Sequence, residues 1–164
     1  YRNAGRTERT GFEAMDSAEL FEGIQATASY TYTRAKFTDF FVKESSESFT
    51  GNRVPGVPEN SFYAEILYVH PTGFFASLEG RVIGEFYADN ANSVVTEAYG
   101  VLDLRLGWKV EWGKWRLTPY SAVSNLTDTV YSDNVRLNAD FGRYYEPAAG
   151  VQVQVGLGIA YRFE

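Results

Sequence analysis

The strongest constraint on the fold is a strict alternation at the end of the chain. From Val151 to Phe163 every second residue is apolar, and the intervening residues are polar or small. A period of two predicts a strand, because successive side chains point to opposite faces. Globular strands average roughly 5–6 residues, whereas a tilted strand that crosses a bilayer needs about 9–11. The run therefore predicts a transmembrane β-strand with lipid on its apolar face and a lumen on its polar face. The alternative is a long strand of a soluble sandwich or barrel.

The same pattern recurs along the chain and predicts about seven strands, at residues 6–16, 24–37, 61–69, 74–86, 99–110, 115–126 and 151–163. We expect Pro119 at a bulge or a sheet edge, because proline lacks a backbone donor.

Short and long connections alternate between these strands. The expected short turns are Asp16–Glu19, His70–Gly73 and Glu111–Lys114, and the long connections are Thr38–Glu59, Tyr87–Ala98 and Ser132–Gly150. Tight periplasmic turns opposite long extracellular loops are typical of membrane barrels. The fold class predicted is therefore all-β, an antiparallel up-and-down transmembrane β-barrel with about 7–8 strands present, as part of a larger barrel.

Composition limits the number of domains, the kind of membrane segment and the classes of partner. The 164 residues fit one barrel segment, 1–164, and no stretch of about 18 apolar residues could form a transmembrane helix. An aromatic share of 16% fits aromatic girdles at both membrane interfaces. The net charge of −6 argues against nucleic acid as a partner, because phosphate binding needs a basic surface.

The strand count also predicts how much of a protein is present. Complete single-chain bacterial barrels have an even number of strands. An odd count with the last strand ending in the periplasm predicts a segment of a longer protein that begins in an extracellular loop. No signal peptide is visible, which agrees with that expectation.

Several motifs appear in order along the chain. They are Asn3-Ala4-Gly5, Gly11-Phe12-Glu13, the segment from Gly51 to Pro58, Asn125-Leu126-Thr127-Asp128 with Tyr131, the segment from Gly142 to Pro147, and the terminal strand that ends at Phe163. With these motifs the chain resembles the C-terminal part of a TonB-dependent outer-membrane receptor. The resemblance covers essentially the whole chain and depends on the ordered set rather than on any single motif.

This resemblance implies a 22-stranded barrel closed by an N-terminal plug that this chain does not contain. It implies uptake of a ferric siderophore, or less often of cobalamin, haem or a sugar, energised by TonB through the missing N-terminal part. It also implies that the barrel-assembly machinery reads the terminal strand, through Gly158, Tyr161 and Phe163. Two positions depart from the family pattern: Glu164 follows the terminal aromatic residue, and Gly156 stands where a polar residue is usual.

Candidate ligand-binding residues lie in the expected outer loops: Arg53, Tyr87, Arg143, Tyr144 and Tyr145. Arginine and tyrosine suit anionic or catecholate ligands, through charge-assisted hydrogen bonds and stacking. The alternative is that these side chains only pack the loops or the membrane interface.

The charged residues expected to face the lumen are Glu65, Glu79, Arg81, Asp103, Arg105 and Arg116. They fit a ligand path or, more simply, a set of cross-strand ion pairs. The acidic loop residues Glu44, Glu47, Asp89, Asp133 and Asp140 lack the spacing of a calcium loop, so no metal site and no cofactor are predicted.

The sequence argues against an enzyme. The only histidine, His70, lies in an expected periplasmic turn, and no Gly-x-Ser-x-Gly motif occurs, so no catalytic residues are predicted.

Two alternatives to a receptor segment stay open. One alternative is a self-contained small outer-membrane barrel for structure or adhesion, with an eighth strand within Thr38–Glu59. Another is a soluble ligand-binding β-barrel. A segment with two exposed edges also suggests pairing with a second copy, a homo-oligomer.

Overall fold

The computed structural model describes residues 5–43 and 46–163, and it is built almost entirely of strands. Asn3, Ala4, Glu44 and Glu164 therefore lie outside the described residues. Seven long strands follow the chain: β1 (Arg6–Phe21), β2 (Ile24–Asp39), β5 (Asn60–Val69), β6 (Phe74–Ile83), β9 (Tyr99–Trp108), β11 (Trp115–Ser124) and β14 (Gln152–Tyr161). The predicted number of strands is confirmed.

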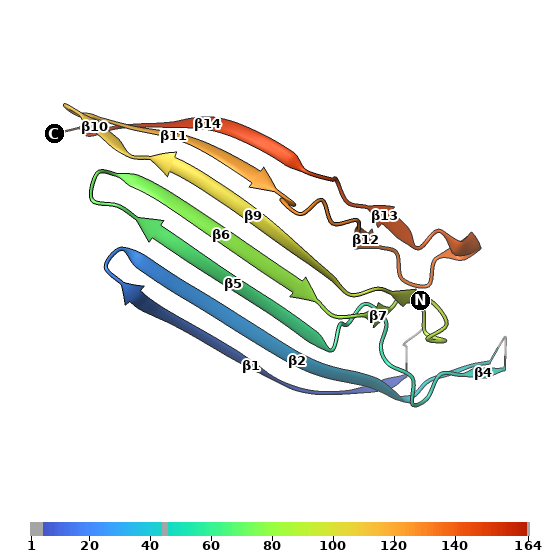
Figure 1. The fold of residues 1–164 in the computed structure, drawn as a ribbon. Coiled ribbons are helices and arrows are strands. Elements are labelled where there is room, and N and C mark those ends of the chain that lie inside the picture. The colour runs from blue at the N-terminus through green and yellow to red at the C-terminus, as the bar shows by residue number, and fades with distance from the viewer. Residues whose placement is uncertain (1–4, 44–45, 164) are drawn as a thin grey trace.

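These strands form one antiparallel sheet in which neighbours in sequence are neighbours in space (Figure 1). The order is β1-β2-β5-β6-β9-β11-β14, and β10 (Val110–Trp112) continues β9 along β11. The sheet is open, because β1 pairs only with β2 and β14 only with β11 among the described strands. The small self-contained barrel is not supported, since the connection 40–59 forms only the two-residue strands β3 (Phe41–Val42) and β4 (Glu47–Ser48).

The register places the apolar residues on one face. Directly opposed residues share a face, so Ile24 pairs with Tyr68, Leu78 with Leu104, and Leu117 with Ile159. The second face carries Thr27, Glu65, Arg105 and Gln154. We call these the outward face and the inward face.

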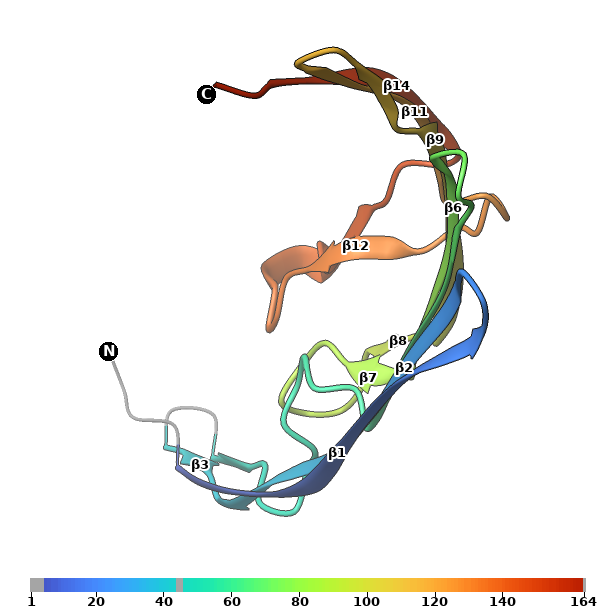
Figure 2. The same cartoon turned by 90° about the vertical axis from the view of Figure 1, so that its left-hand side faces the viewer.

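The curvature of the sheet distinguishes the two faces. The sheet is an arc, and the long connections lie inside it (Figure 2). Phe37 on the inward face is buried and packs on Phe40, which packs on Phe49. Tyr99 on the same face stacks on Tyr131, with ring centroids 4.4 Å apart. The connections therefore cover the concave, inward face, and the apolar face is convex.

Aromatic residues gather at both ends of the outward face. Near the short turns, Phe74 contacts Tyr68 and Trp108, and Trp115 contacts Tyr161. At the other end, Phe12 contacts Tyr30 and Tyr32 at 5.6 and 6.0 Å. Two aromatic zones separated by aliphatic side chains have the arrangement of a membrane-spanning β-sheet.

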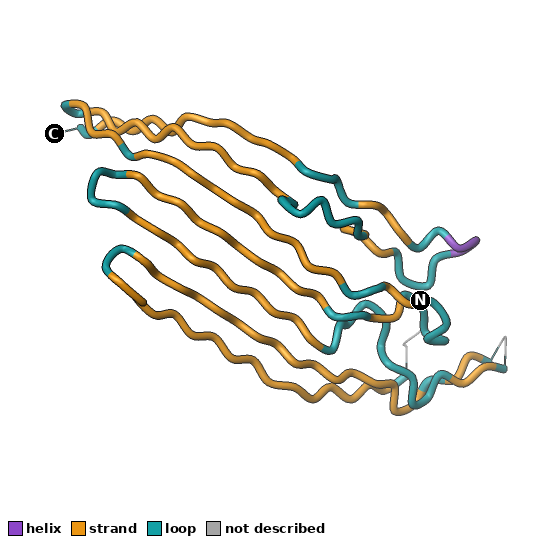
Figure 3. The backbone as a smooth tube through the Cα atoms, viewed as in Figure 1, coloured by secondary structure: helices purple, strands orange, loops and turns teal. Residues whose placement is uncertain are grey.

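The short turns lie at one end of the strands and the long connections at the other (Figure 3). The long connections carry their own short elements: β3, β4, β7 (Phe86–Tyr87), β8 (Val95–Thr96), β12 (Ser132–Val135), the 3₁₀ helix η1 (Asp140–Gly142) and β13 (Tyr145–Pro147). The predicted sorting of connections by length is confirmed.

The turn predicted at Asp16–Glu19 is wrong. Asp16 and Ser17 pair with Ala28 and Thr27 inside a continuous strand. The chain turns instead at Glu22-Gly23, where Gly23 has φ 75°. Polar residues resemble a turn in sequence, but here they are paired within β1, and the pairing continues to Phe21.

The prediction for Pro119 is also wrong. Pro119 lies in the interior strand β11 and pairs with Leu157 of β14 in unbroken register. On the other side, the ladder between β9 and β11 stops at Gly107 and resumes with β10 at Val110. The missing donor is therefore tolerated through a local gap in one ladder rather than a bulge.

The turn His70–Gly73 depends on its glycine. Gly73 has φ 92°, and a Cβ atom there would lie 2.2 Å from the Lys109 carbonyl oxygen. The backbone nitrogen of Lys109 donates to the Gly73 carbonyl oxygen at 2.8 Å, so the turn is held against the start of β10. Gly113, in the next short turn, has φ 60°, and a Cβ atom there would have no described neighbour within 4 Å.

Replacing Gly73 with alanine is therefore expected to destabilise the sheet more than Gly113→Ala does. Both variants lose about 1 kcal/mol or more from the left-handed backbone, and only Gly73→Ala adds a collision with backbone. Urea unfolding in detergent micelles, followed by tryptophan fluorescence, measures the two free energies of unfolding. Equal losses would contradict the close packing of this turn.

Candidate functional site

The three long connections join into one hydrogen-bonded unit at the outer end of the sheet. We call residues 40–43, 46–59, 84–98 and 130–150 the loop body. Asn92 bridges two connections: the Arg53 nitrogen donates to Asn92 Oδ1 at 2.7 Å, and Asn92 Nδ2 donates to the Arg53 carbonyl oxygen at 2.9 Å. The Asn90 nitrogen donates to Asn138 Oδ1 at 2.8 Å, which ties in the third connection.

Asp89 fixes the turn from which these bridges extend. This residue is buried, and its carboxylate accepts from the backbone nitrogens of Ser93 and Val94 and from the Ser93 hydroxyl. A buried carboxylate with three donors is satisfied within its own loop. Asp89 therefore holds the structure of its own loop.

Two of the candidate ligand residues, Arg53 and Tyr87, form a cation–π contact with each other. The Arg53 guanidinium lies over the Tyr87 ring, 5.4 Å from its centroid. It also lies 3.4 Å from the Glu59 carboxylate and 4.0 Å from that of Glu85. The Gly56 nitrogen donates to the Tyr87 carbonyl oxygen at 2.8 Å. These contacts give both residues a packing role inside the loop body.

Tyr145 is engaged as well. Its hydroxyl donates to the Val95 carbonyl oxygen at 2.6 Å and so joins β13 to the connection 84–98. Next to it, Glu146 accepts from Asn134 at 2.9 Å and from Arg136 at 2.7 Å. The hydrogen bond from Asn134, together with the Arg136 guanidinium, lowers the pKa of the Glu146 carboxyl. The β12–β13 hairpin therefore keeps this stabilisation above the ordinary glutamate pKa and loses it as pH falls through the lowered value.

Among the described residues, the side chains at the tip of the same hairpin form no hydrogen bond or ion pair with the other connections. Phe141 is 96% exposed at φ 59°, Arg143 is exposed, and Tyr144 is partly exposed. Among the described residues, no ion pair or side-chain hydrogen bond holds the Arg143 guanidinium. The hairpin lies inside the arc of the sheet, over the inward face (Figure 2). Sequence reasoning missed Phe141; its signal was a large apolar residue within the polar run from Asn138 to Arg143.

The charged residues of the inward face form fewer ion pairs than expected. Arg81 lies 3.6 Å from Asp103, Arg116 bonds to Glu111 at 2.6 Å, and Arg105 lies over the Tyr120 ring at 5.1 Å. Glu65 stands directly opposite Glu79, which stands directly opposite Asp103. The register thus brings three acids into one row on the concave face instead of alternating the signs of charge.

The motif Asn125-Leu126-Thr127-Asp128 closes the end of β11. Asn125 is buried at φ 52°, and its amide donates to the Thr129 and Ala149 carbonyl oxygens. Its backbone nitrogen donates to Asp103 Oδ1 at 2.8 Å. The Val151 nitrogen donates to Asp128 Oδ1 at 3.2 Å, so the motif also anchors the start of the terminal strand. Its role here is structural.

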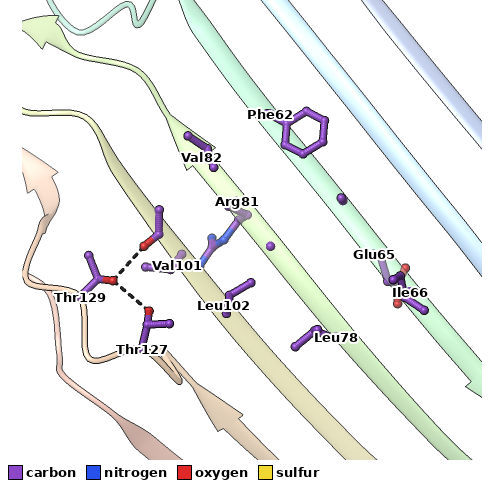
Figure 4. A pocket seen from close by; sticks show the side chains of 13 residues that line it. Phe62, Glu65, Ile66, Leu78, Arg81, Val82, Val101, Leu102, Thr127 and Thr129 are labelled. Carbon is purple, nitrogen blue, oxygen red and sulfur yellow. Dashed lines mark hydrogen bonds between the residues drawn. The ribbon is translucent and has the colours of Figure 1, made fainter.

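A hollow of about 520 Å³ lies on the outward face and holds none of the ligand candidates (Figure 4). Its floor is formed by the small residues Ala64, Gly80 and Gly100, and its walls include Leu78 and Leu102. Thr127 and Thr129 share a hydrogen bond at its rim. An apolar hollow on the convex face is a place for hydrocarbon rather than for a polar ligand.

The residues expected to be read by the assembly machinery lie on the terminal strand, toward the end of the sheet that carries the short turns. Tyr161 lies on the outward face between Trp115 and Phe163, at 4.8 and 4.9 Å from their rings. Gly158 lies on the inward face opposite Thr118. Among the described residues, no cluster of three acidic or histidine side chains could hold a metal ion. Within the same part of the chain, no helix has the length and apolar character needed to cross a bilayer.

Comparisons with known proteins identify relatives along most of the chain. The ferrioxamine B receptor of Salmonella typhimurium (strain SL1344) is 28% identical over 139 residues, which are 80% of this chain and 19% of that protein. The ferrichrome outer membrane transporter/phage receptor of Escherichia coli (strain K12) is 29% identical over 103 residues, which are 60% of this chain and 13% of that protein. The chain thus spans at most about a fifth of these relatives.

A solved structure shares the fold. The ferric citrate transporter FecA in its unliganded form superposes with a TM-score of 0.79 at 19% identity, over 94% of this chain and 24% of that chain. The arc of strands is therefore similar to one part of a transporter barrel. The relatives named here are receptors and transporters, in agreement with the prediction that the chain is not an enzyme.

A family model also matches residues 1–140, under the description "TonB dependent receptor-like, beta-barrel". This match covers all the long strands except β14. The chain belongs to the TonB-dependent receptor β-barrel family.

Proposed function

We propose that this chain forms part of the barrel of an outer-membrane receptor that takes up a ferric siderophore by TonB-dependent transport. The observation that carries the proposal is the loop body, which unites three connections over the concave face of a barrel of this family. Two relatives named above are a ferrioxamine B receptor and a ferrichrome transporter, which supports a ferric siderophore as the ligand class.

The candidate ligand residues divide into two groups under this proposal. Arg53, Tyr87 and Tyr145 hold the loop body together through contacts within it. Arg143 and Tyr144, with Phe141, lie at the tip of the hairpin inside the arc of the sheet and contact the ligand. A guanidinium and aromatic rings suit an oxygen-rich ferric complex, through charge-assisted hydrogen bonds and stacking.

The other partners follow from the same proposal. Lipid covers the outward face, and the barrel-assembly machinery binds the terminal strand through Gly158, Tyr161 and Phe163. TonB acts through a part of the receptor outside this chain. The barrel of the complete receptor pairs the free edges of β1 and β14, and a second copy of the chain is the alternative for those edges.

Substitutions at the hairpin tip test the ligand assignment in the complete receptor. Arg143→Ala and Tyr144→Ala are each expected to weaken binding of ferric ferrioxamine B about tenfold, the loss that one charge-assisted hydrogen bond or ring contact supports. Quenching of intrinsic fluorescence during titration measures the dissociation constants. Arg162→Gln, at the opposite end of the strands, is the control and should bind normally. Unchanged binding by both tip variants would reject the assignment of this hairpin.

Asn92 allows a separate test of the loop body. Asn92→Gly tolerates the φ of 56° and removes the side chain that bridges to Arg53. The variant loses two hydrogen bonds between connections and the one from Asn92 Nδ2 to the Asp89 carbonyl oxygen. At about 1 kcal/mol for each hydrogen bond, this should speed hydrogen exchange in residues 46–59 and 86–96 at least tenfold. Asn134→Gly removes a bond within one hairpin and should leave these segments protected. Normal protection in Asn92→Gly would mean that the connections are ordered independently.

A further inference from the structure

One acidic side chain lies on the outward face, within the apolar part of the sheet. Asp16 of β1 is exposed and stands directly opposite Ala28 of β2, in an unbroken stretch of register. The next residue, Ser17, lies on the inward face, where its hydroxyl group is 3.0 Å from that of Thr27. Alternation along β1 therefore turns Asp16 away from the lumen.

The depth of Asp16 follows from the aromatic residues of the same strand. Phe12 lies four residues before Asp16 and contacts Tyr30 and Tyr32 in the outer aromatic zone. Phe21 lies five residues after Asp16, at the end of β1 next to the short turn. At about 3.4 Å per residue and a strand tilt of about 40°, Asp16 lies roughly 10 Å from the level of Phe12 and roughly 13 Å from that of Phe21. The apolar band of a membrane barrel is about 25 Å tall, so Asp16 lies near its middle.

In the seven long strands as described, Asp16 is the one residue with a formal charge on the outward face between the two aromatic zones. The outward residues in its row on the following strands are small or apolar: Ala28, Ala64, Gly80 and Leu102. A charge on the lipid side of a barrel destabilises it most at the midplane. Charged side chains within a membrane are therefore found paired, and the Asp16 carboxylate needs a partner.

The described part of the chain does not supply that partner. Within it, the Asp16 carboxylate has no hydrogen bond and no ion pair. The outward residues on either side of it along β1 are Ala14 and Ala18, and the Tyr30 hydroxyl of β2 donates to Asn60 at 2.6 Å. β1 is the edge of the sheet and pairs only with β2 (Figure 1). A partner can therefore approach Asp16 from the free edge of β1.

We infer that the strand which pairs with this free edge in the complete receptor carries an arginine or lysine on its outward face, opposite or diagonal to Asp16, and that the ion pair fixes the register of the two strands. The inference rests on the receptor barrel of the proposed function and does not depend on the ligand. Cβ atoms of directly opposed residues are about 4.5–5.5 Å apart and those of diagonal neighbours about 7–8 Å, within reach of a long basic side chain. Charge complementarity selects a basic residue, because an unpaired carboxylate is costly away from water.

The ion pair excludes a slip in register that alternation permits. A one-residue slip would turn the apolar residues to the lumen, so the sequence pattern alone opposes it. A two-residue slip keeps both faces, and the small residues Ala14 and Ala18 place no large side chain against it. That slip moves the basic residue about 7 Å along the strand from Asp16 and separates the two charges in hydrocarbon.

Disulfide cross-linking of the complete receptor in outer membranes tests the inference. This chain has no cysteine, so Ala18→Cys is combined in turn with a cysteine at each outward position of the neighbouring strand, in a receptor without other cysteines. One position should cross-link in the parent receptor. Asp16→Asn should raise the yield at the position two residues away about tenfold, because the charges no longer oppose the slip.

Glu13→Gln is the matched control. Glu13 is an acid of the same strand, but it lies on the inward face opposite Thr31. Its replacement should leave the cross-linking pattern of the parent receptor unchanged. Asp16→Glu keeps the charge and should also keep the parent pattern.

Exchange of the two charges covers the case in which Asp16→Asn assembles poorly. Asp16→Lys, combined with aspartate in place of the basic residue, should restore the parent cross-link, whereas Asp16→Lys alone should not. The inference is overturned by a parent pattern in Asp16→Asn, an equal change in Glu13→Gln, no rescue by the exchanged pair, or no basic residue at the opposite and diagonal outward positions. Failure of the parent receptor to bind ferric ferrioxamine B would instead count against the proposed function and would leave the cross-links unchanged.

Discussion

The structure depends on one constraint: a strand that crosses hydrocarbon must pair its backbone donors and acceptors with neighbouring strands. No water is present there to satisfy them, and each unpaired group costs several kcal/mol. The continuous registers of β2, β5, β6 and β9 meet this requirement over about ten residues each. The exception at Pro119 is confined to one gap between β9 and β10, with the ladder to β14 intact.

The same pairing organises the functional side of the molecule. A curved sheet separates its two faces, so Leu78 and Leu104 lie on the convex face while the connections fold over Ala35 and Phe37 on the concave face. The connections are held together by side chains that form hydrogen bonds with the backbone of another connection. The Asn92 amide, for example, accepts from the Arg53 nitrogen and donates to the Arg53 carbonyl oxygen. The side chains of Phe141 and Arg143 at the hairpin tip are exposed, and our proposal places the ligand contacts there.

At the candidate site, residue type alone leaves the role of a side chain open. Arg53, Tyr87 and Tyr145 have the chemistry of ligand contacts, yet the structure uses all three to join connections. Asp89 is acidic and lies in a loop, yet its oxygens cap the turn that Asn92 extends. Composition states which interactions a side chain can make, whereas the approach of distant segments decides which ones it does make.

The number of strands, the sorting of short and long connections and the receptor family could all be predicted from the sequence, and these predictions are confirmed. These features follow from alternation and chain order, which are local properties. Strand pairing was needed to show that Asp16–Glu19 continues a strand and that Glu65, Glu79 and Asp103 stand in one row. The packing of the connections also joins Asn92 to Arg53, which lie in different connections. Register and loop packing bring together residues far apart in sequence, and no local pattern records those contacts.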